Sequence, residues 1–186
     1  MKKLRQVKIR KDTLRMNVEW TIYKWGKIPE EVTAFLQNGG SIKEACEMLG
    51  LEVLPSTERM IHNVGLNVGL QNLIDIICGI GTTTLYNNAN ARLGVGSDAT
   101  AADPTQTDLI DATPTWKAMD ATYPQKSGQT AEWRSTFGSD DANEAWNEYA
   151  VDNGATAHKL LNRKVESKGT KASGETWTLS LKITFS

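Results

Sequence analysis

Large apolar and polar residues alternate along the last segment of the chain. Residues 177–185 read Trp-Thr-Leu-Ser-Leu-Lys-Ile-Thr-Phe, with an apolar side chain at every odd position. Because successive side chains of a β-strand point to opposite faces, this pattern predicts a half-buried C-terminal strand. The same alternation over residues 14–22 predicts a second strand near the beginning of the chain.

Four shorter segments between these two have the same strand-like pattern: residues 91–96, 129–137, 146–151 and 160–168. Turn-forming residues such as Ser127-Gly128 separate them. The fold expected is mainly β, and α+β overall. Residues 80–186 are predicted to form an antiparallel β-sandwich of jelly-roll kind.

Three segments in the first half have helical spacing. Pro29 suits the first turn of a short helix over residues 29–37. Ser41 and Glu44 make a capping-box pair at the start of a helix over residues 41–49. A third helix is indicated by apolar residues three or four positions apart, which are Leu66, Leu70, Leu73, Ile74 and Ile77. This helix is predicted to pack between the two halves of the chain.

Composition changes after this third helix, where Thr, Asn, Ala, Asp and Gly become frequent. A domain boundary is therefore expected near residues 79–85. Residues 1–79 are predicted to be a docking region of two strands and two or three helices, and residues 80–186 the sandwich domain. Across the 186 residues, 39% are hydrophobic and 23% are charged, which is typical of a soluble protein. No apolar run is long enough to span a membrane, and the charged N-terminus does not read as a secretory signal.

Positive charge is concentrated at the N-terminus. Residues 1–15 hold seven Lys or Arg and one Asp, whereas the whole chain has a net charge of −1. Val7 and Ile9 alternate with basic residues, so the arm is predicted to dock as a strand on an acidic or edge-strand surface of a neighbouring protein. A solvated edge strand is the alternative. The arm residues predicted to dock are Lys2, Lys3, Arg5, Val7, Lys8, Ile9, Arg10 and Lys11. No aromatic residue lies among them, which argues against a single-stranded nucleic acid as the partner, and a nucleic-acid partner is not expected.

The sequence contains no clear catalytic or metal-binding pattern. His62 and His158 are the only histidines, and neither has another His or Cys at the spacing that a zinc site needs. Nor is there a nucleophile elbow. We therefore predict no catalytic residue, no metal ligand and no cofactor, and we expect a protein that is not an enzyme.

Two segments look like fragments of ligand sites. Leu93-Gly94-Val95-Gly96 lacks the third glycine of a dinucleotide fingerprint, so its glycines are predicted to allow a close approach within a sheet. The loop over residues 98–111 carries Asp98, Asp103, Asp108 and Asp111. Their spacing differs from an EF-hand, which leaves calcium binding and a solvated loop as open alternatives.

The chain has six tryptophans, which is many for its length. Trp133 and Trp177 lie in alternating strands and are predicted to be core residues. Trp25 and Trp116 flank loops and are predicted to lie at an interface, where aromatic residues are enriched. Exposed tryptophans that form a glycan platform are a further alternative.

A series of short motifs covers residues 60–186. They are NNANA at 87–91, LGVG at 93–96, TQTDL at 105–109, KAMD at 117–120, YP at 123–124, WRSTFG at 133–138, AWNE at 145–148, LNRKV at 161–165 and the TLSLKIT tail. Taken as a series, they resemble structural proteins of tailed bacteriophages and prophages. The resemblance implies a virion component without catalysis, and it brings no catalytic or metal residues.

The expected function is therefore a virion structural protein, made in the cytoplasm of the host bacterium, that docks on the phage capsid as a decoration protein. Its expected partners are other phage structural proteins, foremost the major capsid protein, with no membrane involved. A homo-oligomer, most simply a trimer, is also expected. The alternatives are a tail, fibre or adaptor subunit and, in another class, a glycan-binding module for attachment to the host surface.

Overall fold

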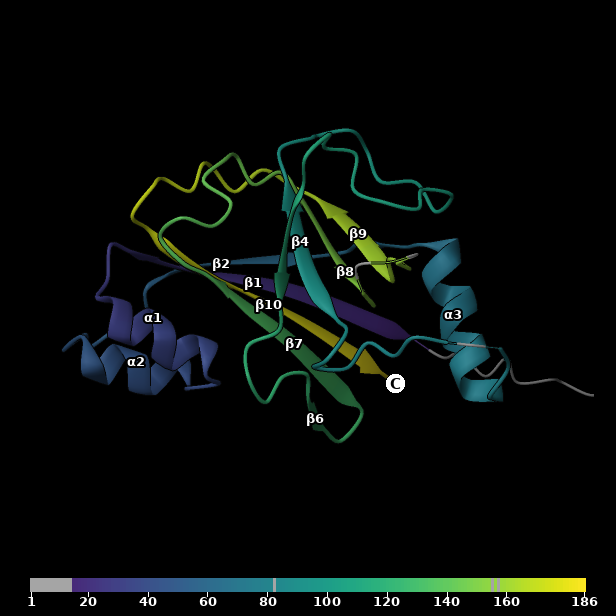
Figure 1. Ribbon diagram of the computed structural model, residues 1–186, viewed down its shortest axis with the longest axis horizontal. Coiled ribbons are helices and arrows are strands. Elements are labelled where there is room, and N and C mark those ends of the chain that lie inside the picture. The colour runs from purple at the N-terminus through teal and green to yellow at the C-terminus, as the bar shows by residue number, and fades with distance from the viewer. Residues whose placement is uncertain (1–14, 82, 155, 157) are drawn as a thin grey trace, which may run out of the picture.

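The protein is mainly β, with two five-stranded antiparallel sheets packed as a sandwich and three helices in its N-terminal half (Figure 1). This computed structural model describes residues 15–81, 83–154, 156 and 158–186. The predicted β-sandwich is confirmed. Within the described residues, no helix is both long enough and apolar enough to cross a membrane.

The first sheet has the strand order β2-β1-β10-β7-β6. Its strands are β2 (Ser56–Ile61), β1 (Met16–Gly26), β10 (Thr176–Phe185), β7 (Thr130–Phe137) and β6 (Gln125–Ser127). The two most regular alternating segments of the sequence, β1 and β10, pair along their whole length, with Trp20 opposite Leu181 and Ile22 opposite Leu179. The apolar positions of both strands therefore lie on one face of the sheet.

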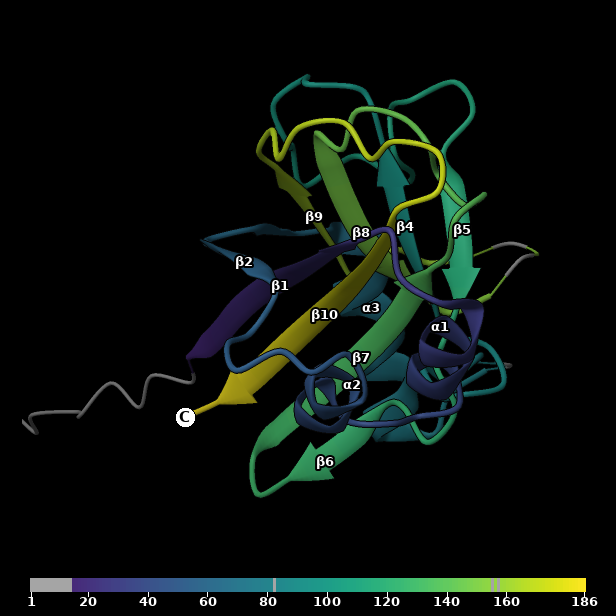
Figure 2. The same cartoon turned by 90° about the vertical axis from the view of Figure 1, so that its left-hand side faces the viewer.

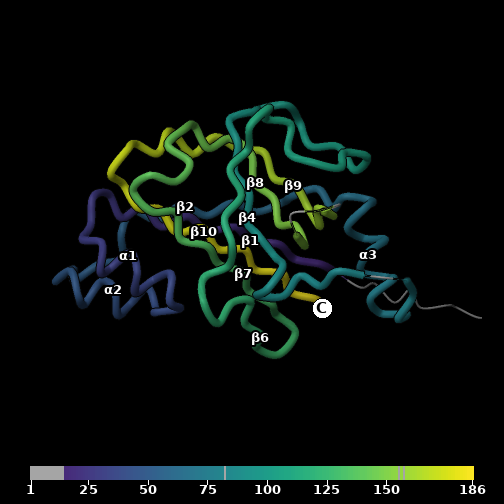
Figure 3. Tube along the Cα trace, in the orientation of Figure 1, coloured from purple at the N-terminus to yellow at the C-terminus, as the bar shows by residue number. Residues whose placement is uncertain are grey.

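The second sheet has the strand order β3-β9-β8-β4-β5. Its strands are β3 (Val64–Gly65), β9 (Asn162–Val165), β8 (Glu148–Asp152), β4 (Arg92–Gly96) and β5 (Thr115–Ala118). Along the trace, the chain crosses between the two sheets after β2, β5, β7 and β9 (Figure 3). Each sheet is therefore assembled from both early and late segments of the chain.

The core lies between the two sheets and is rich in aromatic rings. Trp146 packs edge-on against Phe137 and Trp177, with both pairs of ring centroids 4.9 Å apart. Trp133 and Trp177 are buried in this cluster, as their alternating strands predicted. Such close-packed rings make the cluster the largest source of hydrophobic stabilisation in the fold.

The sandwich extends beyond the range 80–186 that the sequence indicated. β1 and β2 belong to the first sheet and β3 belongs to the second, although all three precede residue 79. The reason is that β10 needs a partner on each side, and the apolar positions of β1 match those of β10. The first 79 residues therefore contribute strands to the sandwich as well as helices.

The three helices lie at two ends of the molecule. Helix α1 (Glu30–Gln37) and helix α2 (Ile42–Met48) sit at one end, and helix α3 (Asn67–Cys78) sits at the other (Figure 1). Figure 2 looks from the first end, with α1 and α2 in front and α3 behind. Ser41 and Glu44 form the predicted capping box at the start of α2, and Gly79 ends α3 in a left-handed conformation with φ 64°.

Candidate docking surface

The residues predicted to dock fall into two groups. Residues 1–14, and with them Lys2, Lys3, Arg5, Val7, Lys8, Ile9, Arg10 and Lys11, lie outside the described residues. Their docking stays a prediction. Trp25 and Trp116 are both described, and they have different surroundings.

Trp25 lies beneath the two N-terminal helices, not at an interface. Odd-numbered residues of β1 point to the outer face of the first sheet, where α1 and α2 cover the ring of Trp25. Its side chain is 8% exposed, and its indole Nε1 donates a hydrogen bond to Thr178 Oγ1 at 3.0 Å. The predicted interface role of Trp25 is therefore wrong, because its ring fixes the helices to the sheet.

Trp116 lies across Gly94 of the neighbouring strand. A Cβ atom added to Gly94 would come within 2.5 Å of the Trp116 ring, so only glycine leaves room for it. The ring is half-buried, with the Arg92 guanidinium 5.1 Å and the His158 ring 5.6 Å from it. The close approach predicted for Gly94 is confirmed, and docking through Trp116 stays a prediction.

The tryptophan rings that a glycan-binding platform would need are buried. The five tryptophans other than Trp116 are between 0% and 8% exposed. A sugar-binding platform needs aromatic faces that are open to solvent, and here those faces are covered by the core or by the helices. The glycan alternative therefore loses the observation that motivated it.

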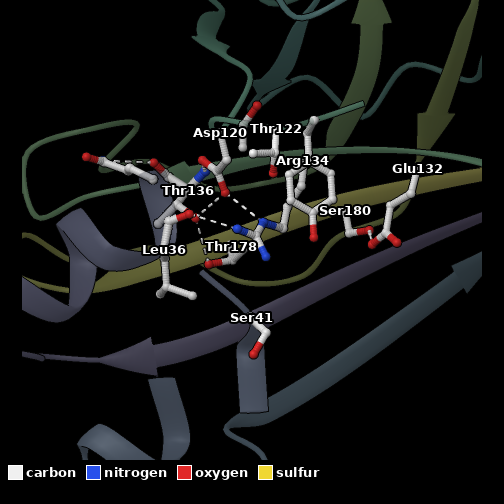
Figure 4. A network of polar contacts seen from close by, with 12 residues as sticks. Leu36, Ser41, Asp120, Thr122, Glu132, Arg134, Thr136, Thr178 and Ser180 are labelled. Carbon is white, nitrogen blue, oxygen red and sulfur yellow. Dashed lines mark hydrogen bonds and ion pairs between the residues drawn. The ribbon is translucent and has the colours of Figure 1, made fainter. Parts of the chain in front are cut away.

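A buried ion pair joins α1 to the outer face of the first sheet (Figure 4). Arg134 donates from Nε to Asp120 Oδ2 and from Nη2 to the carbonyl of Leu36, both at 2.7 Å. Asp120 also accepts from the backbone N–H and the hydroxyl of Thr136, both at 2.8 Å. Burial raises the pKa of Asp120, while Arg134 and these hydrogen bonds favour its ionised form. The bond to Leu36 ties α1 to β7, and the bonds among Asp120, Arg134 and Thr136 tie the segment after β5 to the same strand.

A second buried pair holds the long loop between β4 and β5. The Glu148 carboxylate accepts from the backbone N–H groups of Ile110 and Asp111 at 3.0 and 2.7 Å. Arg163 donates to that carboxylate at 2.7 Å and to the carbonyl of Thr100 at 3.0 Å. Glu148 and Arg163 are both fully buried, so they act as an internal clamp on the loop.

The four acidic residues of this loop have separate partners. Asp98 is 3.8 Å from Arg163, Asp103 accepts from Thr105, Asp108 contacts His158 at 3.0 Å, and Asp111 accepts from Ser97. In the part of the chain that the structure describes, no three His, Cys, Asp or Glu side chains gather closely enough to hold a metal ion. Each of the four carboxylates instead fixes the local path of the loop.

Two groups of exposed apolar side chains remain, and the sequence interpretation missed both. The first, which we call the α2–β2 patch, begins at the last residue of α2 and consists of Met48, Leu51, Val53 and Leu54, each between 43% and 75% exposed. It leads into β2, an edge strand whose partner among the described strands is β1. The sequence signal for this patch was the run at 49–54, Leu-Gly-Leu-Glu-Val-Leu. Its apolar residues fit neither the helix nor the strand spacing that would place them in the core.

The second group, which we call the α3 patch, consists of Leu70, Ile74, Ile77 and Ile80, each between 40% and 78% exposed. The sequence predicted that α3 would pack between the two halves of the chain. Only one side of the helix does so, through Leu73 and Ile76, which contact the core. Because α3 is apolar around more than half of its circumference, the remaining stripe faces outward.

The α2–β2 patch and the α3 patch lie at opposite ends of the molecule, next to the helices after which they are named (Figure 1). Large exposed apolar groups mark sites of contact with other proteins, membranes or ligands. The candidate site is therefore a docking surface at each end. Comparison with known proteins found no matching family model, no matching curated protein and no matching solved structure.

Proposed function

We propose that this chain is a non-catalytic structural protein of a tailed-phage particle, and that it docks on the capsid shell as a decoration protein. The motif series over residues 60–186 motivates the particle. The observation that carries the docking role is the α2–β2 patch beside the open edge of β2.

The α2–β2 patch is large enough to bind a protein. Its four side chains expose roughly 400 Å² of apolar surface, which is the size of the largest patches on monomeric proteins, and such patches are often functional. Val53, at 75% exposed, is its most prominent residue. Burial of this surface against a partner would remove it from water and supply the main favourable term in docking.

The neighbouring edge strand offers a second kind of contact. Arg15 and Ser186 exchange two backbone hydrogen bonds. Because such pairs recur every second residue in an antiparallel ladder, the backbone N–H and C=O groups of odd-numbered β1 residues point toward β10. The even-numbered residues of β1 therefore bond to β2, and they use Ser56, Glu58 and Met60. The backbone groups of Thr57 and Arg59 consequently point away from the sheet, where an extended segment of the capsid protein can add as a strand.

The test is incorporation into particles. In cells that produce the phage, the double variant Val53→Asn with Leu54→Asn should remain folded but be lost from gradient-purified particles. The matched control is Ile110→Asn, which removes an apolar side chain that is 42% exposed in the β4–β5 loop. We expect the control to be retained, with circular dichroism confirming that both variants are folded.

Two results would overturn the proposal. Retention of the folded double variant at the wild-type level would show that the α2–β2 patch does not dock. Recovery of the wild-type chain only in isolated tails, and not in tail-free capsids, would assign it to the tail or adaptor class.

A further inference from the structure

The inner side of α3 is fully used by the fold. Leu73 and Ile76 pack against the core, and a Cβ atom added to Gly69 would lie 2.3 Å from the carbonyl oxygen of Leu160. The outer side carries Leu70, Ile74 and Ile77 at the spacing i, i+4, i+7, which forms a single stripe along a helix. This stripe has no partner among the described residues.

A shallow hollow lies on this outer side of α3. Asn67, Leu70, Gln71, Ile74 and Asp75 line it. The first four are spaced i, i+3, i+4, i+7, which is the set of four residues that forms a hole for one side chain of a facing helix. A side chain of a facing helix would fit between these four residues.

The same helix also carries a matching knob. Ile77 is 78% exposed and lies three residues after Ile74. The centre of the hollow is between Leu70 and Gln71, which is three to four residues before Ile74. Hole and knob are thus placed symmetrically about Ile74. In an antiparallel helix pair with a two-fold axis at Ile74, each Ile77 enters the hollow of the other copy.

The exposed area also fits a second copy. The α3 patch exposes roughly 450 Å² of apolar surface, close to the apolar share of the ~800 Å² that each partner contributes to a standard interface. The only charged residue of α3 is Asp75, beside the proposed axis. We propose that two copies of the chain pair through antiparallel α3 helices, with Ile74 at a two-fold axis, which makes the oligomer a dimer in place of the trimer expected from the sequence. This contact uses the opposite end of the molecule from the α2–β2 patch and does not depend on the proposed capsid docking.

The first test is the mass of the full-length protein in solution. Sedimentation equilibrium should give twice the 20.5 kDa of the chain, and Ile74→Asn should weaken association at least tenfold. Val53→Asn, at the far end, is the matched control and should leave the dimer unchanged. Asp75→Asn should tighten the dimer, because it removes two like charges near the axis. A folding defect would weaken association instead.

The second test fixes the direction of the two helices. In a Cys78→Ser background, Ile74→Cys should form a disulfide-linked dimer on mild oxidation, because the two residues meet at the axis. The native Cys78, which is exposed, should not cross-link. Cys78 lies four residues from the axis, so the two Cys78 residues of the dimer are about 12 Å apart along the helices, which is beyond disulfide reach.

Three results would overturn the proposal. The first is a wild-type chain that stays monomeric, or forms trimers, at millimolar concentration. The second is an unchanged dimer in folded Ile74→Asn. The third is rapid cross-linking of the native Cys78, which would require parallel helices.

Discussion

At the scale of single residues, tryptophan positions show how far local pattern predicts burial. Trp177 and Trp133 follow clear alternation, and their burial could be predicted from the sequence. Trp25 could not be assigned in the same way, because it lies at the end of a strand and is covered by helices that come later in the chain. Gly94 could be predicted to need a close neighbour, but the identity of that neighbour depends on strand pairing, which the sequence does not show locally.

The contact between Gly94 and Trp116 gives the residue-scale prediction. Gly94→Ala should lower the free energy of unfolding by about 1–3 kcal/mol, because the added methyl group collides with the ring. In a Trp116→Ala background the same change should have much less effect. Urea melts of the two single variants and the double variant measure this coupling. Equal effects of Gly94→Ala in both backgrounds would show that the ring does not lie on Gly94.

At the scale of elements, long regular segments could be predicted and short ones could not. The alternation in β1 and β10 and the capping box of α2 are local signals, and each appears where the sequence indicated it. Strands such as β3 and β6 have two and three residues, too few for a pattern, and form only because a longer neighbour pairs with them. Edge strand β2 starts with four polar residues, which hides its strand character.

The attachment of α1 to the first sheet gives the element-scale prediction. Arg134→Met should lower the free energy of unfolding by about 3–5 kcal/mol, because it leaves the Asp120 carboxyl buried without its ion-pair partner. Adding Asp120→Leu to this variant should recover part of the loss, because no buried charge then remains. Thermal and urea melts give both values. A single variant that loses less than about 1 kcal/mol would mean that the pair is not buried as described.

At the scale of the whole molecule, the two exposed patches define two ends with different roles. The α3 patch is proposed to pair with a second copy, and the α2–β2 patch adjoins a sheet edge that no described strand covers. A pair of chains joined through α3 would therefore carry its two α2–β2 patches at its outer ends (Figure 1). The α3 patch could not be located from the sequence, because exposure of an apolar stripe depends on which side of a helix the rest of the fold covers. The α2–β2 patch left only the irregular apolar run at 49–54 as a signal.

The most direct measurement is electron cryomicroscopy of the intact particle, with this chain traced in the density. We expect the chain on the icosahedral shell, with Val53 and Leu54 buried against the capsid protein and a capsid segment paired with the outer edge of β2. Density confined to the tail would contradict the proposed capsid role, as would a chain on the shell whose α2–β2 patch faces solvent.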